Sequence, residues 1–157
     1  MTDYSEEDVR AMELALGEAE RSLCWGDVPI GAVVTRGDEV LARAGNQRER
    51  LHDPTAHAEL LAIRRASAIL KSWRLEGCTL TVTLEPCAMC AGAAVLSRLD
   101  RLVFGAKDPK AGFAGSLGDL TRDPRLNHRL EVTSGVLEER CAELLRAFFR
   151  ERRAETS

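Results

Sequence analysis

The chain has 157 residues, of which 45% are hydrophobic and 30% charged, with a net charge of −3. This composition is ordinary for a globular protein and excludes disordered and fibrous classes, and the length suits a single domain over residues 1–157. The negative net charge gives no global attraction to a polyanion, so any nucleic-acid site has to be local.

Neither a membrane span nor an export signal is indicated. A charged residue interrupts every hydrophobic stretch well before the roughly 20 residues that a bilayer requires, and the first eight residues lack the pattern of a signal peptide. We therefore expect a cytoplasmic protein, in which cysteines are reduced thiols or metal ligands. Because Cys24, Cys78 and Cys141 stand alone among apolar neighbours, we expect them to be small core residues.

The first part of the chain predicts a helix, a hairpin and a second helix. Ser5 precedes three acidic residues and an apolar repeat at helical spacing, which predicts an N-capped helix. Residues 29–35 and 39–44 flank a glycine-containing turn and predict a hairpin. Asp53-Pro54 then predicts the start of a helix that extends to about Leu70.

The second part predicts three strands and two helices. Residues 79–84 alternate as a strand does, and residues 87–97 are small and apolar enough for a buried helix. Residues 102–105 and 130–133 are predicted strands, and apolar positions from Val136 onward mark one face of a C-terminal helix. This order predicts an α/β fold with one mixed, five-stranded sheet and helices on both faces. The long connection 107–127 is expected beside the functional site.

Two short motifs supply the residues of one metal site. His57 and Glu59 place an imidazole and a carboxylate two residues apart, and Cys87 and Cys90 form a Cys-x-x-Cys pair at a helix start, where thiolates are favoured. One histidine and two cysteines would give zinc three protein ligands and an open fourth position, as in catalytic sites. An open zinc lowers the pKa of its water towards 7.

Other interpretations of the cysteine pair stay open on the residues alone. A bare Cys-x-x-Cys also suits a structural zinc knuckle or a redox pair. A structural site needs a fourth ligand, but His52 lies only five residues before His57, and His128 lies in a polar loop. We expect both to be surface residues or to lie behind the ligands. The position of Glu59 directly beside the metal favours a catalytic carboxylate over a solvated one.

The order His-x-Glu and then Pro-Cys-x-x-Cys is typical of zinc-dependent nucleobase deaminases. Over nearly its whole length the chain resembles the bacterial tRNA-specific adenosine deaminases. The resemblance is carried by residues 27–33 (DVPIGAV), 52–59 (HDPTAHAE), 83–93 (TLEPCAMCAGA), 104–112 (FGAKDPKAG), 127–129 (NHR) and 148–150 (FFR). It implies a three-layer α/β/α cytidine deaminase-like fold, a homodimer with one zinc ion per subunit, and conversion of the wobble adenosine of an arginine tRNA to inosine.

The same resemblance assigns roles to individual residues. It makes His57, Cys87 and Cys90 the zinc ligands, and Glu59 a proton shuttle that does not bind metal. Asn46 resembles the asparagine that binds the flipped nucleoside, with an ordinary turn residue as the alternative. Val28, Pro29 and Ile30 are expected to form an apolar wall against which the base packs. The backbone amide of Ala88 is expected to donate to the zinc-bound oxygen or to the base edge. Independently of the resemblance, RNA contacts are expected at Lys107, Asp108, Lys110, Arg150, Arg152 and Arg153, with ordinary solvated surface residues as the alternative.

Two other functions compete with this one. The zinc and glutamate chemistry also occurs in deaminases of a free base or nucleoside such as guanine or cytosine. Residues 148–153 (FFRERR) combine aromatic rings with arginines, which favours a single-stranded RNA loop, although an amphipathic helix explains the two Phe equally well. A non-catalytic zinc subunit would lack the shuttle carboxylate, and Glu59 is present.

Overall fold

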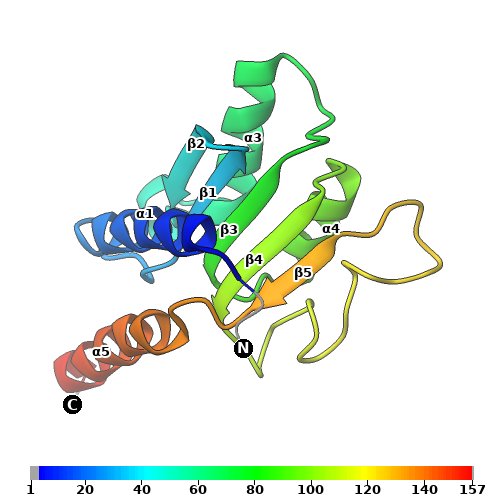
Figure 1. Cartoon of the computed structure of the whole chain (residues 1–157). Helices are drawn as coiled ribbons and strands as arrows, with labels where there is room; N and C mark the ends of the chain where they lie inside the picture. Colours follow the sequence, from blue (N-terminus) through cyan, green and yellow to red (C-terminus); the bar gives the residue numbers. More distant parts are fainter. Residues whose placement is uncertain (1–3, 157) are drawn as a thin grey trace.

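Five strands form one mixed sheet in the order β2-β1-β3-β4-β5 (Figure 1). The computed structural model describes residues 4–156. β1 (Gly31–Arg36) pairs antiparallel with β2 (Glu39–Gly45) and β3 (Thr79–Leu84). β4 (Arg101–Ala106) runs parallel to β3 and to β5 (Glu131–Ser134). The predicted α/β fold with a mixed five-stranded sheet is confirmed.

Helices cover both faces of this sheet (Figure 1). α3 (Ala58–Leu70) and α4 (Ala88–Leu96) pack on one face, and α1 (Glu6–Leu23) and α5 (Glu138–Thr156) pack on the other. A further helix, α2 (Arg48–Leu51), spans about one turn. The result is the three-layer architecture that the resemblance implies. Within residues 4–156, no helix combines the length and apolarity that crossing a membrane requires.

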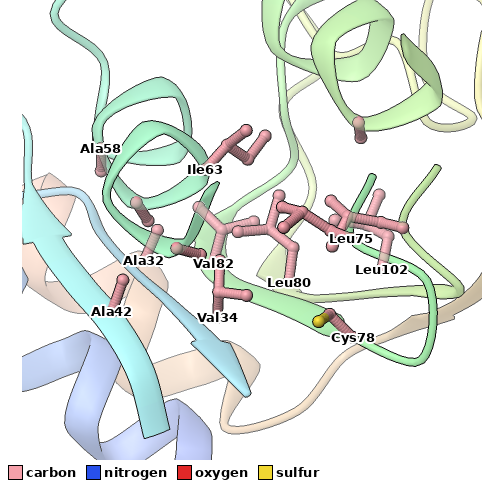
Figure 2. Packing of buried hydrophobic residues seen from close by; sticks show 14 of the residues in the cluster. Ala32, Val34, Ala42, Ala58, Ile63, Leu75, Cys78, Leu80, Val82 and Leu102 are labelled. Carbon is pink, nitrogen blue, oxygen red and sulfur yellow. The ribbon is translucent and has the colours of Figure 1, made fainter. Parts of the chain in front are cut away.

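Strand alternation sorts the core side chains between the two helical layers. Val34 of β1 belongs to the cluster beneath α3 and α4, whereas its neighbour Val33 belongs to the cluster beneath α1 and α5. Figure 2 shows Val34 together with Leu80 and Val82 of β3 and Ile63 of α3. Each such side chain contributes about 1.5–3 kcal/mol when fully buried. The two clusters therefore hold the helices firmly on the sheet.

A pair of glycines lets α1 lie directly against the start of the sheet. Gly31 and Gly45 face each other in the β1–β2 ladder. A Cβ on Gly31 would lie 1.8 Å from the carbonyl oxygen of Ala15, and one on Gly45 would lie 2.5 Å from that of Glu18. A larger residue at either position would displace α1. The contact between α1 and these glycines fixes the start of β1, which residues 28–30 directly precede.

The start of α3 differs from the prediction. α3 begins at Ala58 rather than at Asp53-Pro54. The Asp53 carboxylate accepts hydrogen bonds from the backbone N–H and the hydroxyl of Thr55, at 2.8 and 2.7 Å, and so closes a local turn instead of capping a helix. α2 was not predicted, and α5 begins two residues after Val136. The remaining boundaries lie within one or two residues of the predicted ones.

One of the three isolated cysteines is also placed differently from the prediction. Cys78 and Cys141 are buried as expected, but Cys24 is exposed. Cys24 is the C-cap of α1; its N–H donates to the carbonyl oxygen of Arg21, and the N–H of Trp25 donates to that of Ser22, each at 3.0 Å. The chain turns there on the surface, so the apolar neighbours of Cys24 in the sequence do not place it in the core.

An ion pair joins α1 to the start of β4. Two guanidinium nitrogens of Arg101 donate to the two carboxylate oxygens of Asp8 at 2.7 and 2.9 Å, and one of them also donates to Thr133. Asp8 completes a capping box with Ser5 at the start of α1. Burial raises the pKa of Asp8, but the hydrogen bonds with Arg101 and Ser5 lower it by a larger amount. The pKa of Asp8 therefore lies below its ordinary value.

We predict that Asp8→Asn lowers the free energy of unfolding by about 1.5–3 kcal/mol near neutral pH, because a charged hydrogen-bond partner is lost. The folded-state pKa of Asp8 is depressed, so the stabilisation is present above the unfolded-state pKa and is lost as the pH falls through the folded-state value. Urea unfolding at neutral and strongly acidic pH measures both effects, and the difference between wild type and variant should shrink in acid.

The matched control is Glu39→Gln, which removes the exposed ion pair between Arg36 and Glu39. Exposed pairs contribute at most about 1 kcal/mol, so this variant should remain close to wild type. Equal losses in Asp8→Asn and Glu39→Gln would contradict the importance of the Asp8–Arg101 pair.

Candidate active site

α3 and α4 begin at the same edge of the sheet, the edge at which β3 and β4 end (Figure 1). α3 runs away from this edge, β3 returns to it, and α4 leaves it again. The residues that precede the two helices, His57 and Cys87, are both N-caps with extended backbone. Ligand sites in open α/β sheets characteristically lie outside the carboxyl ends of the strands. This topology brings the two sequence motifs together.

His57, Cys87 and Cys90 form a group that could hold a metal ion. Nδ1 of His57 lies 3.7 Å from Sγ of Cys87 and 3.5 Å from Sγ of Cys90, and the three ligand atoms lie within 4.8 Å of one another. One imidazole and two thiols suit Zn²⁺, and three protein ligands are the number found in catalytic zinc sites. Within residues 4–156 no other group of three or more His, Cys, Asp or Glu residues fits a metal ion in this way.

The other histidines do not belong to this group. His52 is exposed at the end of α2. His128 is half-buried, and its Nε2 lies 2.6 Å from the carbonyl oxygen of Leu99. Neither supplies the fourth ligand that a structural zinc site requires, in agreement with the prediction.

The contacts within the group favour a thiolate at Cys87. The hydrogen bond from the Cys90 thiol, followed by the contact with His57, lowers the pKa of Cys87 to about 3. The same hydrogen bond, together with burial, raises the pKa of Cys90. The hydrogen bond with Cys87 also raises the pKa of His57. Because the thiolate is the form that binds a metal, Cys87 is preset as a ligand.

Glu59 lies in the first turn of α3, beside the metal group but not part of it. Its side chain is buried and lines the same cavity as His57 and Cys87. Burial raises the pKa of Glu59 to about 7. A carboxyl group with a pKa near neutrality can both accept and donate a proton. Its position therefore suits proton transfer.

A cavity of about 1070 Å³ opens beside the metal group. Most of the residues singled out from the sequence line it, namely Val28, Ile30, Asn46, His57, Glu59, Cys87, Lys107, Asp108, Lys110, Arg150, Arg152 and Arg153. Pro29 and Cys90 are buried and do not line it, and Ala88 is the exposed first residue of α4. The structure therefore brings the expected chemistry and the expected RNA contacts to one cavity.

The Asn46 side chain is hydrogen-bonded to the backbone through both ends of its amide. Its Nδ2 donates to the carbonyl oxygen of Val28 at 3.2 Å, and its Oδ1 accepts from the N–H of Arg48 at 3.2 Å. These bonds hold the segment after β2 against the wall formed by residues 28–30. Since an amide carries two N–H groups and two lone-pair positions on its oxygen, Asn46 retains the capacity to bind a ligand.

Arginines of α5 that were expected at the RNA surface also make contacts within the protein. Arg150 donates to Glu143 at 2.9 Å. Arg152 donates to the carbonyl oxygen of Gly26 at 2.5 Å, and its guanidinium carbon lies 5.0 Å from the ring centroid of Phe148. The C-terminal half of α5 is thereby held next to the segment that leads into residues 28–30. This contact closes one side of the cavity.

Sequence analysis missed two buried carboxylates that support the cavity walls. Asp27 accepts hydrogen bonds from the N–H groups of Glu49 and Arg50, at 2.7 and 3.2 Å, where α2 begins. Glu85 accepts hydrogen bonds from the connection that follows β4, beginning with the N–H of Asp108 at 3.0 Å. Asp27 and Glu85 both stand in segments that carry the family resemblance, 27–33 and 83–93, but nothing in those segments assigned them a role.

Comparison with known proteins agrees with this geometry. A sequence model of the MafB19-like deaminase family matches residues 6–153. The tRNA-specific adenosine deaminase of Bacillus subtilis (strain 168) is 54% identical over 147 residues, which are 94% of this chain and 91% of that protein. The chain belongs to the tRNA-specific adenosine deaminase family. The family resemblance predicted from the motifs is thus confirmed.

Solved structures place this deaminase within the wider fold. A structure from a study of A-to-I editing by tRNA:A34 deaminases at the wobble position of transfer RNA is 46% identical, with a TM-score of 0.83 over 87% of this chain and 99% of that chain. A guanine deaminase from Nitrosomonas europaea is 26% identical, with a TM-score of 0.74 over 94% and 86% of the two chains. The similarity to the tRNA deaminase is greater in both sequence and structure.

We predict that this deaminase holds about one zinc ion per chain and that Cys90→Ala loses most of it, because two protein ligands bind zinc far more weakly than three. Zinc content is measured by inductively coupled plasma mass spectrometry after dialysis. Cys78→Ala is the matched control, since Cys78 is equally buried but lies outside the metal group. Full zinc retention in Cys90→Ala would show that the ligand set is wrong.

Proposed function

We propose that this protein is a hydrolytic, zinc-dependent deaminase that converts the wobble adenosine of an arginine tRNA to inosine. The observation that carries the proposal is that one cavity is lined both by His57, Cys87 and Glu59 and by a group of Lys and Arg side chains, the basic rim. The names of the relatives and of the solved tRNA:A34 deaminase support the same reaction. The proposal includes a single domain over residues 1–157, one zinc ion per subunit, a homodimer and a cytoplasmic location.

In the proposed reaction, His57, Cys87 and Cys90 hold the zinc ion. When bound, zinc would act as a Lewis acid and lower the pKa of water enough to yield hydroxide near neutral pH. Glu59 takes up the proton from water and delivers it to N1 of adenine, so that C6 becomes electrophilic and gains the oxygen. Glu59 then passes the proton of the new hydroxyl group to the exocyclic amine. The C6–N6 bond breaks, ammonia leaves and inosine remains.

The base is proposed to lie between the apolar wall and Asn46. Val28 and Ile30 line the cavity, and Pro29, which lies between them in the chain, is buried. The Asn46 amide would hydrogen-bond the nucleoside. The backbone N–H of Ala88 is in the first turn of α4, where N–H groups lack acceptors within the helix, and it would donate to the reacting group.

The rim of the cavity suits an RNA loop better than a free base. Among the lining residues, basic side chains outnumber acidic ones by seven to four, although the whole chain has a net charge of −3. The basic ones are Arg48, Lys107, Lys110, Arg146, Arg150, Arg152 and Arg153. Two of the acidic ones, Glu59 and Glu85, are buried. The exposed ring of Phe149 offers a stacking surface to an unpaired base.

We predict that Glu59→Gln keeps about one zinc ion per chain but lowers kcat by about 10²–10⁴-fold, because the metal ligands remain while proton transfer is lost. Inosine formation and zinc content are measured on the same preparation. Glu49→Gln changes an exposed carboxylate at the same cavity and should keep most of the activity. If Glu59→Gln lost its zinc, Glu59 would have to be reassigned as a ligand.

We predict that an anticodon stem-loop with adenosine at the wobble position is deaminated far faster than free adenosine, cytidine or guanine. Flanking bases and phosphates provide contacts that orient the reacting atom, and a loop base is already unpaired. Inosine formation is followed for each substrate. A stem-loop with its adenosine moved by one position is the control and should react poorly. Comparable rates for free adenosine and the stem-loop would favour a small-molecule deaminase.

The salt dependence of stem-loop binding tests whether the basic residues of the rim contact phosphates. For a single strand, log affinity falls with log salt by about 0.7 per phosphate neutralised, so Lys110→Gln should make the slope shallower by about that amount. Arg36→Gln is the control, because Arg36 ends β1 at the opposite edge of the sheet and does not line the cavity. RNA affinity that does not change with salt would contradict phosphate recognition by this rim.

A further inference from the structure

The connection that follows β4 wraps around one buried carboxylate, that of Glu85. Oε1 accepts hydrogen bonds from the N–H of Asp108 at 3.0 Å and from the hydroxyl of Ser116 at 2.5 Å. Oε2 accepts from the N–H groups of Ala114 and Ser116, each at 3.0 Å. Four donors from residues 108–116 therefore converge on a side chain that is only 2% exposed.

Gly112 passes directly against the same carboxylate. A Cβ at this position would lie 2.3 Å from Cδ of Glu85 and 2.4 Å from its Oε2, so a larger residue would force the two apart. The N–H of Phe113 also donates to the carbonyl oxygen of Pro86 at 2.9 Å. The connection is thus attached to residues 85–86, directly before the metal-group residue Cys87.

The attached segment forms one wall of the cavity. Lys107, Asp108, Lys110 and Ala111 all line the cavity. The Asp108 carboxylate accepts hydrogen bonds from the N–H groups of Lys110 and Ala111, at 3.1 and 3.2 Å, which makes residues 107–111 a closed turn. Because the N–H of Asp108 also donates to Glu85, the position of this whole turn depends on the Glu85 carboxylate.

We propose that Glu85 is a positioning residue that fixes turn 107–111 relative to Cys87 and so controls the affinity for the nucleic-acid substrate, without taking part in the chemistry. The effect on RNA rests on the proposed function, whereas the attachment of the turn does not. A displacement of a binding wall by about 1 Å weakens the contacts that it makes with parts of the substrate remote from the reacting atoms. Glu59 and Cys90 lie on α3 and α4, and His57 and Cys87 are the N-caps of these helices, so all four are outside the displaced segment.

Three variants disturb this attachment in different ways. Glu85→Gln keeps the side-chain volume but replaces one acceptor oxygen by an NH₂ group that faces other donors. Gly112→Ala places a methyl group against the carboxylate while leaving Glu85 intact. Ser116→Ala removes the hydroxyl donor alone. Gly17→Ala on α1 is the control, because nothing lies within 4 Å of the added methyl group.

The first measurement is hydrogen exchange on the zinc-loaded protein without RNA. The N–H groups of Asp108, Ala114 and Ser116 should exchange at least about tenfold faster in Glu85→Gln and Gly112→Ala than in wild type, because local opening becomes easier when their acceptor is lost or displaced. Gly17→Ala should match wild type at these positions. The amides of α3 and α4 should be unchanged in all variants.

The second measurement separates KM from kcat on the wobble stem-loop. Glu85→Gln and Gly112→Ala should raise KM about tenfold, with kcat within about twofold and zinc near one per chain, which indicates lost substrate binding rather than lost chemistry. Ser116→Ala should raise KM less, because three of the four donors remain. A purely structural role would instead lower zinc content and kcat.

Several results would overturn the proposal. Unchanged exchange and unchanged KM in both Glu85→Gln and Gly112→Ala would show that the carboxylate does not hold the turn. Loss of zinc or of kcat at constant KM would show that Glu85 supports the structure of the metal group rather than substrate binding. If Glu85→Gln does not fold, Gly112→Ala and Ser116→Ala carry the same test. If the wild type does not deaminate the stem-loop, the proposed function fails, and hydrogen exchange alone decides whether Glu85 holds the turn.

Discussion

The geometry of the site depends on the packing of α3 and α4 on the same face of the sheet with a common starting edge. β3 lies between the two helices in the chain and returns to that edge, so the N-caps His57 and Cys87 meet there. Fully buried alanines on both helices, such as Ala62 and Ala94, allow close packing against the sheet. The ligand atoms then lie within 4.8 Å of one another as a consequence of core packing.

The sequence identified the metal residues and Glu59 of the site, but not the buried carboxylates that support the walls of the cavity. The metal residues and Glu59 belong to two motifs whose members are two or three residues apart, so local spacing identifies each motif. The partners of Asp27 and Glu85 are mostly backbone N–H groups and all lie more than 20 residues away, and no side-chain pattern records such contacts. The start of α3 was misplaced because Asp53-Pro54 has the composition of a helix start while Asp53 serves a local turn.

The cavity combines two kinds of wall. Residues 28–30, Asn46 and the metal group flank the sheet and its helices, and core packing fixes them. Turn 107–111 and the end of α5 are held instead by hydrogen bonds, from Asp108 to Glu85 and from Arg152 to Gly26. The guanine deaminase of Nitrosomonas europaea shares the fold at 26% identity. A common frame with separately attached outer walls explains how one fold accommodates different substrates.

The buried carboxylates differ in how far hydrogen bonds compensate for their burial. At Asp8 and Glu85, bonds from Arg101 and from the 108–116 connection outweigh burial, and each pKa lies below its ordinary value. At Glu59 burial prevails and raises the pKa to about 7. A carboxylate stabilised by four donors stays charged near neutral pH, so it can only anchor its partners. A carboxyl group whose charged and neutral forms have similar free energies at this pH can exchange protons. The number of donors that the fold directs at each glutamate therefore separates an anchor at Glu85 from a candidate proton shuttle at Glu59.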